Sequence, residues 1–128
     1  MTETSPIPAE IARVFALQQA NQGNVKATSA EQRKAKLAKL KAAVETRADA
    51  IVSAILEDTR KPEGEIRVTE VLGVMGNIQR NIDNLEAWMQ PVEITPSLNP
   101  DDKAQILSEA RGVCLILGPW NFPLGLTL

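Results

Sequence analysis

The chain has 128 residues, of which 44% are hydrophobic and 23% are charged, a balance typical of a globular protein and not of a disordered one. The formal net charge of −2 gives no reason to expect nucleic acid as an obligatory partner. The sequence contains no histidine, which excludes histidine acid–base catalysis and the usual nitrogen ligands of metals, so no metal site is predicted.

The first residues and the cysteine usage bear on location. Residues 1–10 have neither the basic segment nor the apolar segment of a signal peptide. No apolar run approaches the length of a membrane span. One cysteine allows no internal disulfide and fits a reducing compartment. We therefore expect a cytoplasmic protein without a membrane span.

The first predicted helix is short. The polar residues 1–8, with Pro6 and Pro8, form a lead-in, and Pro8 suits the first position of a helix. Apolar residues follow at helical spacing, and Asn21–Gln22–Gly23 would close the segment with a C-cap signal.

Two longer helices are predicted next. Ser29 and Gln32 form an S-x-x-Q capping box at the start of the second, which would run over residues 30–59 if it is continuous. Pro62 ends that helix near Arg60 and begins the third, which ends at residues 90–91. Each helix has one apolar stripe, composed of Leu37, Leu40, Val44, Ala48, Ile51 and Ile55 in the second and of Val68, Val71, Met75, Ile78, Ile82, Leu85 and Met89 in the third. Two one-sided helices joined by a tight turn should pack as an antiparallel pair.

After the helices the apolar period changes from helical to alternating. Val92 and Ile94 share one face of a predicted strand, and Pro96 limits that strand to a sheet edge. Residues 97–102 have the composition of a turn, and residues 103–109 contain a weaker strand pattern. An antiparallel β-hairpin is therefore predicted.

The most specific stretch follows the hairpin. Five apolar residues, Val113–Leu117, stand between turn residues and predict a strand buried on both faces. The turn at Gly118–Pro119 then presents one neutral amide, Asn121, where an open α/β sheet would bind a ligand. A buried strand needs neighbours, and the sequence contains no further strand pattern up to Leu128. We therefore expect the sequence to stop part-way through a domain and to expose apolar surface on its own.

Each of these features has a simpler alternative. Asn121 could be a turn residue that bonds to its own backbone, and Trp120 could be a core aromatic. The basic residues of the second helix could form a nucleic-acid or membrane face, but they are interpreted as a solvated face, because no aromatic residues are interleaved with them and balancing acids follow downstream. Asp58 and Glu65 are better explained as helix-end charges than as a metal pair.

Residues 117–123, Leu-Gly-Pro-Trp-Asn-Phe-Pro, resemble the P-W-N-F/Y-P strand-and-turn motif of the aldehyde dehydrogenase superfamily. Residues 57–62, with Glu65 after them, residues 85–88 and the Arg111–Gly112–Val113 entry are similar too. The short N-terminus looks most like the class 3 branch, which acts on fatty and aromatic aldehydes. The resemblance covers nearly the whole chain, but only residues 112–123 are specific.

The resemblance implies a fold and a set of roles. Residues 112–128 would form the first strand and turn of an NAD- or NADP-binding, Rossmann-like domain, with Leu117, Gly118, Pro119 and Trp120 beside the cofactor. Asn121 would be the amide of the oxyanion hole, and Phe122 would line the aldehyde tunnel. A cysteine thiolate and a glutamate base would complete the reaction, but both lie downstream in relatives. Cys114 is not that nucleophile, since it lies inside the predicted buried strand, where a thiol is inert.

The sequence thus predicts an α/β protein with three parts: a helical part (1–90), a β-hairpin of the oligomerisation type (91–111) and an incomplete NAD(P)-binding domain (112–128). Its predicted function is that of the N-terminal part of an NAD(P)-dependent aldehyde dehydrogenase, which would form a homodimer when complete and be inactive as this fragment. The alternative is a non-catalytic helical interaction module whose apolar tail docks a partner.

Overall fold

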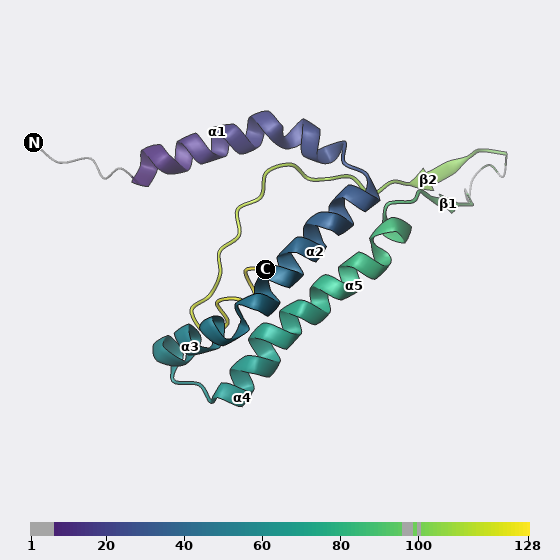
Figure 1. Ribbon diagram of the computed structural model, residues 1–128. Helices are drawn as coiled ribbons and strands as arrows, with labels where there is room; N and C mark the ends of the chain where they lie inside the picture. The colour runs from purple at the N-terminus through teal and green to yellow at the C-terminus, as the bar shows by residue number, and fades with distance from the viewer. Residues whose placement is uncertain (1–6, 96–98, 100) are drawn as a thin grey trace, which may run out of the picture. The chain divides into compact units, whose positions relative to one another are not determined.

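The computed structural model describes residues 7–95, 99 and 101–128; the predicted lead-in before Ile7 lies outside them. The chain forms two compact units. One consists of Met1–Thr28 and Glu109–Leu115, and the other of Ser29–Ser108 and Ile116–Leu128. Helices dominate the described residues, in which one small sheet of two strands is found (Figure 1).

The first unit contains helix α1, Ile7–Lys26, which is longer than the sequence predicted. The expected stop at Asn21–Gln22–Gly23 was wrong, because the helix continues through Gly23. The N–H of Ala27 donates to the carbonyl of Gly23 at 3.1 Å and closes the last turn. A glycine is only about 1 kcal/mol less favourable than alanine inside a helix, so it does not by itself end one.

The second predicted helix is divided in two. Helix α2, Ala30–Thr46, and helix α3, Ala48–Thr59, meet at Arg47. Residues 30–59 therefore do not form one continuous helix. The capping box is confirmed: Gln32 N–H donates to Ser29 Oγ at 3.2 Å, and Ser29 N–H donates to Gln32 Oε1 at 2.9 Å. The predicted end near Arg60 is also confirmed.

The third predicted helix begins with α4, Glu63–Ile66, widens into the π-helix η1, Arg67–Leu72, and continues as α5, Gly73–Trp88. In the wide segment the N–H of Gly73 donates to the carbonyl of Val68, five residues earlier. This turn takes up one extra residue and shifts the buried face. Val68, predicted to be buried, is therefore 61% exposed, whereas Val74 is 2% exposed.

The core of the second unit lies between these helices. Helices α2 and α5 run side by side in opposite directions, as the sequence predicted (Figure 1). The buried apolar side chains are Val44, Val52, Ile55, Ile66, Val71, Val74 and Ile78. Most of the predicted stripe either belongs to this core or packs against it, including Leu37, Leu40, Ala48, Ile51, Met75 and Ile82.

The predicted hairpin is confirmed. Strands β1, Val92–Ile94, and β2, Ala104–Ile106, pair antiparallel with Glu93 opposite Gln105. In the predicted turn, Asp102 N–H donates to the carbonyl of Asn99 at 3.1 Å. Ser97, Leu98 and Pro100 of the predicted turn, and the edge residue Pro96, lie outside the described residues.

The stretch Val113–Leu117 differs from the prediction of a buried strand. No strand is assigned there, and the side chains of Leu115 and Leu117 are 84% and 82% exposed. The physical reason is that no other strand among the described residues pairs with it, so its apolar faces have no cover. Cys114 is likewise exposed rather than buried, which corrects the argument that burial makes this thiol inert. The Rossmann-like arrangement stays a prediction.

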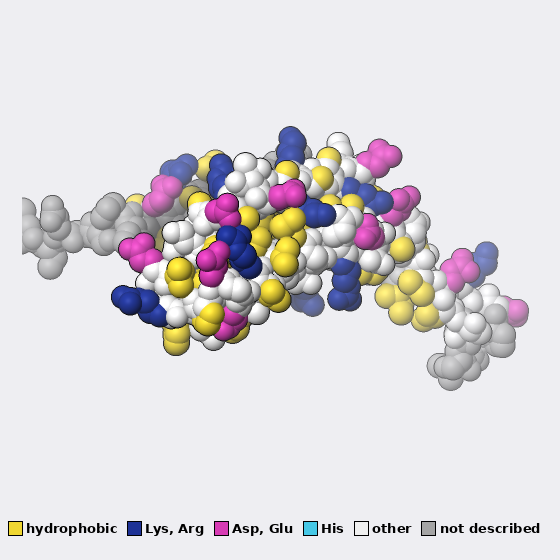
Figure 2. All heavy atoms as spheres, turned by 60° about the horizontal axis from the view of Figure 1, so that its bottom comes forward, with side chains coloured by type: hydrophobic (Ala, Val, Ile, Leu, Met, Phe, Trp, Pro, Cys, Tyr) yellow, Lys and Arg dark blue, Asp and Glu magenta, His cyan; other side chains and the backbone are white. Residues whose placement is uncertain are grey.

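The surface charges are mixed in sign. Figure 2 shows acidic and basic side chains interspersed over the face that it draws. Within the second unit, Lys34 Nζ lies 2.9 Å from Glu86 Oε2, and Arg67 Nη2 lies 2.9 Å from Asp49 Oδ1. No helix in the described residues is both long and apolar enough to cross a membrane.

Candidate functional site

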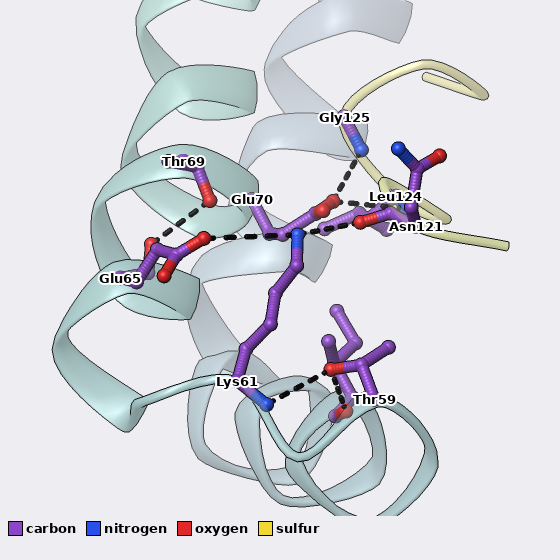
Figure 3. A network of polar contacts seen from close by, with 9 residues as sticks. Thr59, Lys61, Glu65, Thr69, Glu70, Asn121, Leu124 and Gly125 are labelled. Atoms are coloured by element: carbon purple, nitrogen blue, oxygen red, sulfur yellow. Dashed lines mark hydrogen bonds and ion pairs between the residues drawn. The ribbon is translucent and has the colours of Figure 1, made fainter. Parts of the chain in front are cut away.

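Asn121 lies in the turn that follows the extended stretch. Its side chain is exposed, and Figure 3 shows the amide pointing away from Lys61. The amide makes no hydrogen bond to any of the residues that the structure describes, so it does not bond to its own backbone as the simpler alternative held. The turn is therefore held by other groups.

Lys61 holds one side of this turn. Its Nζ donates to the backbone carbonyl of Asn121 at 2.5 Å (Figure 3). The same Nζ lies 3.6 Å from the centre of the Phe122 ring. Glu65 Oε1 lies 3.9 Å from the same ammonium. The Lys61 side chain is only 17% exposed, whereas Asn121 and Glu65, which it contacts, are more open to water.

The local backbone explains why Lys61 points this way. Arg60 ends helix α3 in the left-handed region with a φ of 58°, which is uncommon for a residue other than glycine. The next N–H, that of Lys61, donates to Thr59 Oγ1 at 3.3 Å, and this hydroxyl donates to the carbonyl of Ile55 at 2.7 Å. Pro62 follows and starts α4. The sharp reversal between α3 and α4 thus directs Lys61 toward Asn121.

Glu70 holds the other side of the turn. Its side chain lies in η1 and is 0% exposed. Oε2 accepts the N–H of Gly125 at 2.6 Å and that of Leu124 at 3.1 Å (Figure 3). Oε1 has no hydrogen-bond partner among the residues described.

The bonds to Glu70 fall at the beginning of a helical turn. Leu126 N–H donates to the carbonyl of Phe122 at 3.3 Å, and Leu128 N–H donates to that of Leu124 at 3.0 Å. The first N–H groups of a helix have no partner inside it, and an anion there is favoured by the helix dipole. Glu70 therefore caps this turn from a distant helix.

Two glycines permit the close packing of the segment. A Cβ on Gly125 would lie 3.3 Å from Glu70 Oε2, and a Cβ on Gly118 would lie 2.1 Å from Thr127 Oγ1. The absence of a side chain at Gly118 therefore lets the segment fold back on itself, and at Gly125 a Cβ would require the Glu70 carboxylate to move slightly.

The other predicted site residues are brought together by sequence adjacency rather than by a preformed cavity. Leu117 is 82% and Trp120 is 85% exposed, which excludes the core alternative for Trp120 in this chain. Gly118 is exposed and Pro119 is partly buried. No backbone–backbone hydrogen bond joins residues 117–120 to the rest of the described chain. Phe122 is partly buried against Lys61.

Sequence reasoning missed both Lys61 and Glu70 as site residues. Lys61 stood in the segment 57–62 that carried the resemblance, but no role followed from it. No sequence pattern indicated that Glu70 is buried, since an unbroken α-helix would direct it away from the stripe that contains Val71 and Met75. Among the described residues, no group of three or more aspartate, glutamate or cysteine side chains could hold a metal ion.

The comparisons with known proteins agree with the motif. The sequence model of the aldehyde dehydrogenase family matches residues 7–128. The chain belongs to the aldehyde dehydrogenase family. It is 43% identical over 119 residues to AldX of Bacillus subtilis (strain 168), a match that covers 93% of this chain and 27% of that protein.

Members of family 3 are also similar to it. The identity is 38% over 76 residues with human aldehyde dehydrogenase family 3 member B1, covering 59% of this chain and 16% of that protein. It is 32% over 104 residues with the chloroplastic family 3 member I1 of Arabidopsis thaliana, covering 80% of this chain and 18% of that protein. The chain therefore spans about a quarter or less of the length of these relatives.

Proposed function

We propose that this chain is the N-terminal part of an NAD(P)-dependent aldehyde dehydrogenase that oxidises an aldehyde to a carboxylic acid. The observation that carries the proposal is the exposed, unbonded amide of Asn121 within the Pro119–Trp120–Asn121–Phe122–Pro123 turn of a chain of this family. An amide donates a hydrogen bond to a developing negative charge without being ionisable itself, which suits an oxyanion hole.

The residues of this chain would supply one hydrogen-bond donor, part of the substrate path and part of the cofactor contact. Asn121 would donate its side-chain N–H to the aldehyde oxygen as that oxygen becomes negative. The ring of Phe122 would line the path of the substrate. NAD or NADP, when bound beside the residues from Leu117 to Trp120, would supply the hydride acceptor. The free backbone groups of these four residues fit such a contact.

The nucleophile and the base would come from outside the sequence given. Its only cysteine, Cys114, precedes the motif and lies exposed in the extended stretch. We therefore propose that the 128 residues alone do not oxidise aldehydes. The homodimer that the resemblance implies would use the β-hairpin, whose side chains Val92 and Ile106 are 57% and 56% exposed.

The test is the substitution Asn121→Ala in the complete protein. We expect turnover with a medium-chain or aromatic aldehyde to fall by about 10²–10³-fold, the usual effect of removing one oxyanion-hole donor. Cofactor affinity should stay nearly unchanged. Asn84→Ala is the matched control, because Asn84 lies on the exposed face of α5 and donates only to the carbonyl of Arg80. Equal turnover of the Asn121 variant and the wild type would refute the oxyanion role.

A further inference from the structure

Glu70 is the one fully buried charged side chain among the described residues, and its only partners are backbone groups of the motif segment. Burying a carboxylate is costly unless hydrogen bonds replace its water. Here Oε2 is bonded by the N–H groups of Leu124 and Gly125, which follow directly after the Pro-Trp-Asn-Phe-Pro sequence, whereas Oε1 has no partner among the described residues. The position of Glu70 and the position of this turn are therefore coupled.

Lys61 provides a second, independent anchor. Its ammonium donates to the backbone carbonyl of Asn121 and contacts the ring of Phe122. The carboxylate of Glu70 instead accepts the N–H groups of Leu124 and Gly125. The cation thus meets a carbonyl and the anion meets two N–H groups, so each charge matches the dipole that it contacts. Together they hold the five residues from 121 to 125 at both ends and leave the Asn121 amide unbonded.

We propose that Glu70 and Lys61 are positioning residues that fix the Asn121 amide for catalysis; this inference rests on the proposed function. Neither side chain needs to touch the substrate. An oxyanion donor works only when it lies within hydrogen-bond distance of the place where the charge forms. Asn121 lies in a turn outside any helix or strand, so side-chain anchors must supply the rigidity that a regular element would otherwise give.

The kinetic test uses Glu70→Ala, Glu70→Gln and Lys61→Met in the complete protein, and each of the three should lower kcat per active site. We expect Glu70→Ala to lower kcat per active site by about 10–100-fold, since a misplacement of about 1 Å can cost about 10²-fold. Glu70→Gln keeps one acceptor oxygen and should lose less. The KM for the cofactor should stay within about twofold, because residues 117–120 are not bonded to either anchor. Glu86→Gln is the control, because it removes the same negative charge from an exposed side chain.

A double substitution separates positioning from general destabilisation. If Glu70 acts through Asn121, then Glu70→Ala should cost little further kcat in an Asn121→Ala background, because residues that act as a unit are not additive. A full multiplicative loss in the double variant would overturn the positioning role. So would wild-type kcat in both Glu70 variants.

Amide hydrogen exchange in the 128-residue chain tests the anchoring without any turnover. We expect Glu70→Ala to speed exchange of the Leu124 and Gly125 N–H groups by about tenfold or more, since each loses a bond to a charged acceptor. Asn121→Ala should leave both rates unchanged. Unchanged exchange in Glu70→Ala would overturn the anchoring. A complete wild-type protein that oxidises no aldehyde, with this exchange effect present, would instead overturn the proposed function and the catalytic consequence with it.

Discussion

The substitutions Val74→Ala and Val68→Ala make the same chemical change at two positions of one helical run. Val74 is 2% exposed and Val68 is 61% exposed. Each change removes two methyl groups, and each buried group of this size contributes about 0.8 kcal/mol of transfer free energy. Together with the cavity left behind, we expect Val74→Ala to lower the free energy of unfolding by about 2 kcal/mol.

Val68→Ala should change the free energy of unfolding by no more than about 0.5 kcal/mol, because the side chain is mostly in water and alanine is the better helix former. Urea unfolding of the 128-residue chain, followed by circular dichroism at constant m-value, measures both changes. An unbroken α-helix with the predicted stripe would bury Val68 instead. A larger cost at Val68 than at Val74 would therefore refute the π-turn and the placement of Glu70 that depends on it.

Two further predictions concern the helix starts. Ser29→Ala should cost about 1 kcal/mol of stability in urea unfolding, because it removes an N-cap bond, while Ser53→Ala on the exposed face of α3 should cost much less; equal effects would contradict the capping box. The pKa of Glu10 lies below its ordinary value of 4.5, because Arg13 donates two hydrogen bonds to its carboxylate. The stabilisation by this pair is therefore present above the unfolded-state pKa and is lost as the pH falls through the lowered one. NMR titration should place the Glu10 midpoint below 4.5 and return it toward 4.5 in Arg13→Ala; a wild-type midpoint at or above 4.5 would contradict the pair.

Much of the fold could be predicted from the sequence because its signals are local. Ser29 and Gln32 are three residues apart, and the capping box needs nothing else. The change from helical to alternating period at Pro91 likewise placed the hairpin within a few residues of β1. Gly23 shows where such signals fail, since a glycine is compatible with both a helix end and a helix interior.

The site depended on contacts that no local pattern contains. The motif identified Asn121, but Lys61 precedes it by 60 residues and Glu70 precedes Gly125 by 55. The π-turn that brings Glu70 to the buried face has no sequence signature of its own. The prediction of a buried strand from Val113 to Leu117 was wrong for a different reason. The composition of this stretch suits a buried strand, but strand formation requires a neighbour to pair with.

The sequence distance between the anchors and the turn also sets an order of events during synthesis. Helices form within about microseconds, whereas the ribosome adds about 5–20 residues each second. Lys61 is therefore synthesised roughly 3–12 s, by that translation rate, before the Asn121 carbonyl that it meets. During this interval Glu70 has no backbone N–H to accept, and its carboxylate must stay hydrated. We expect η1 to remain open until the motif emerges, so that the turn and the wide helical segment complete each other in one late folding step.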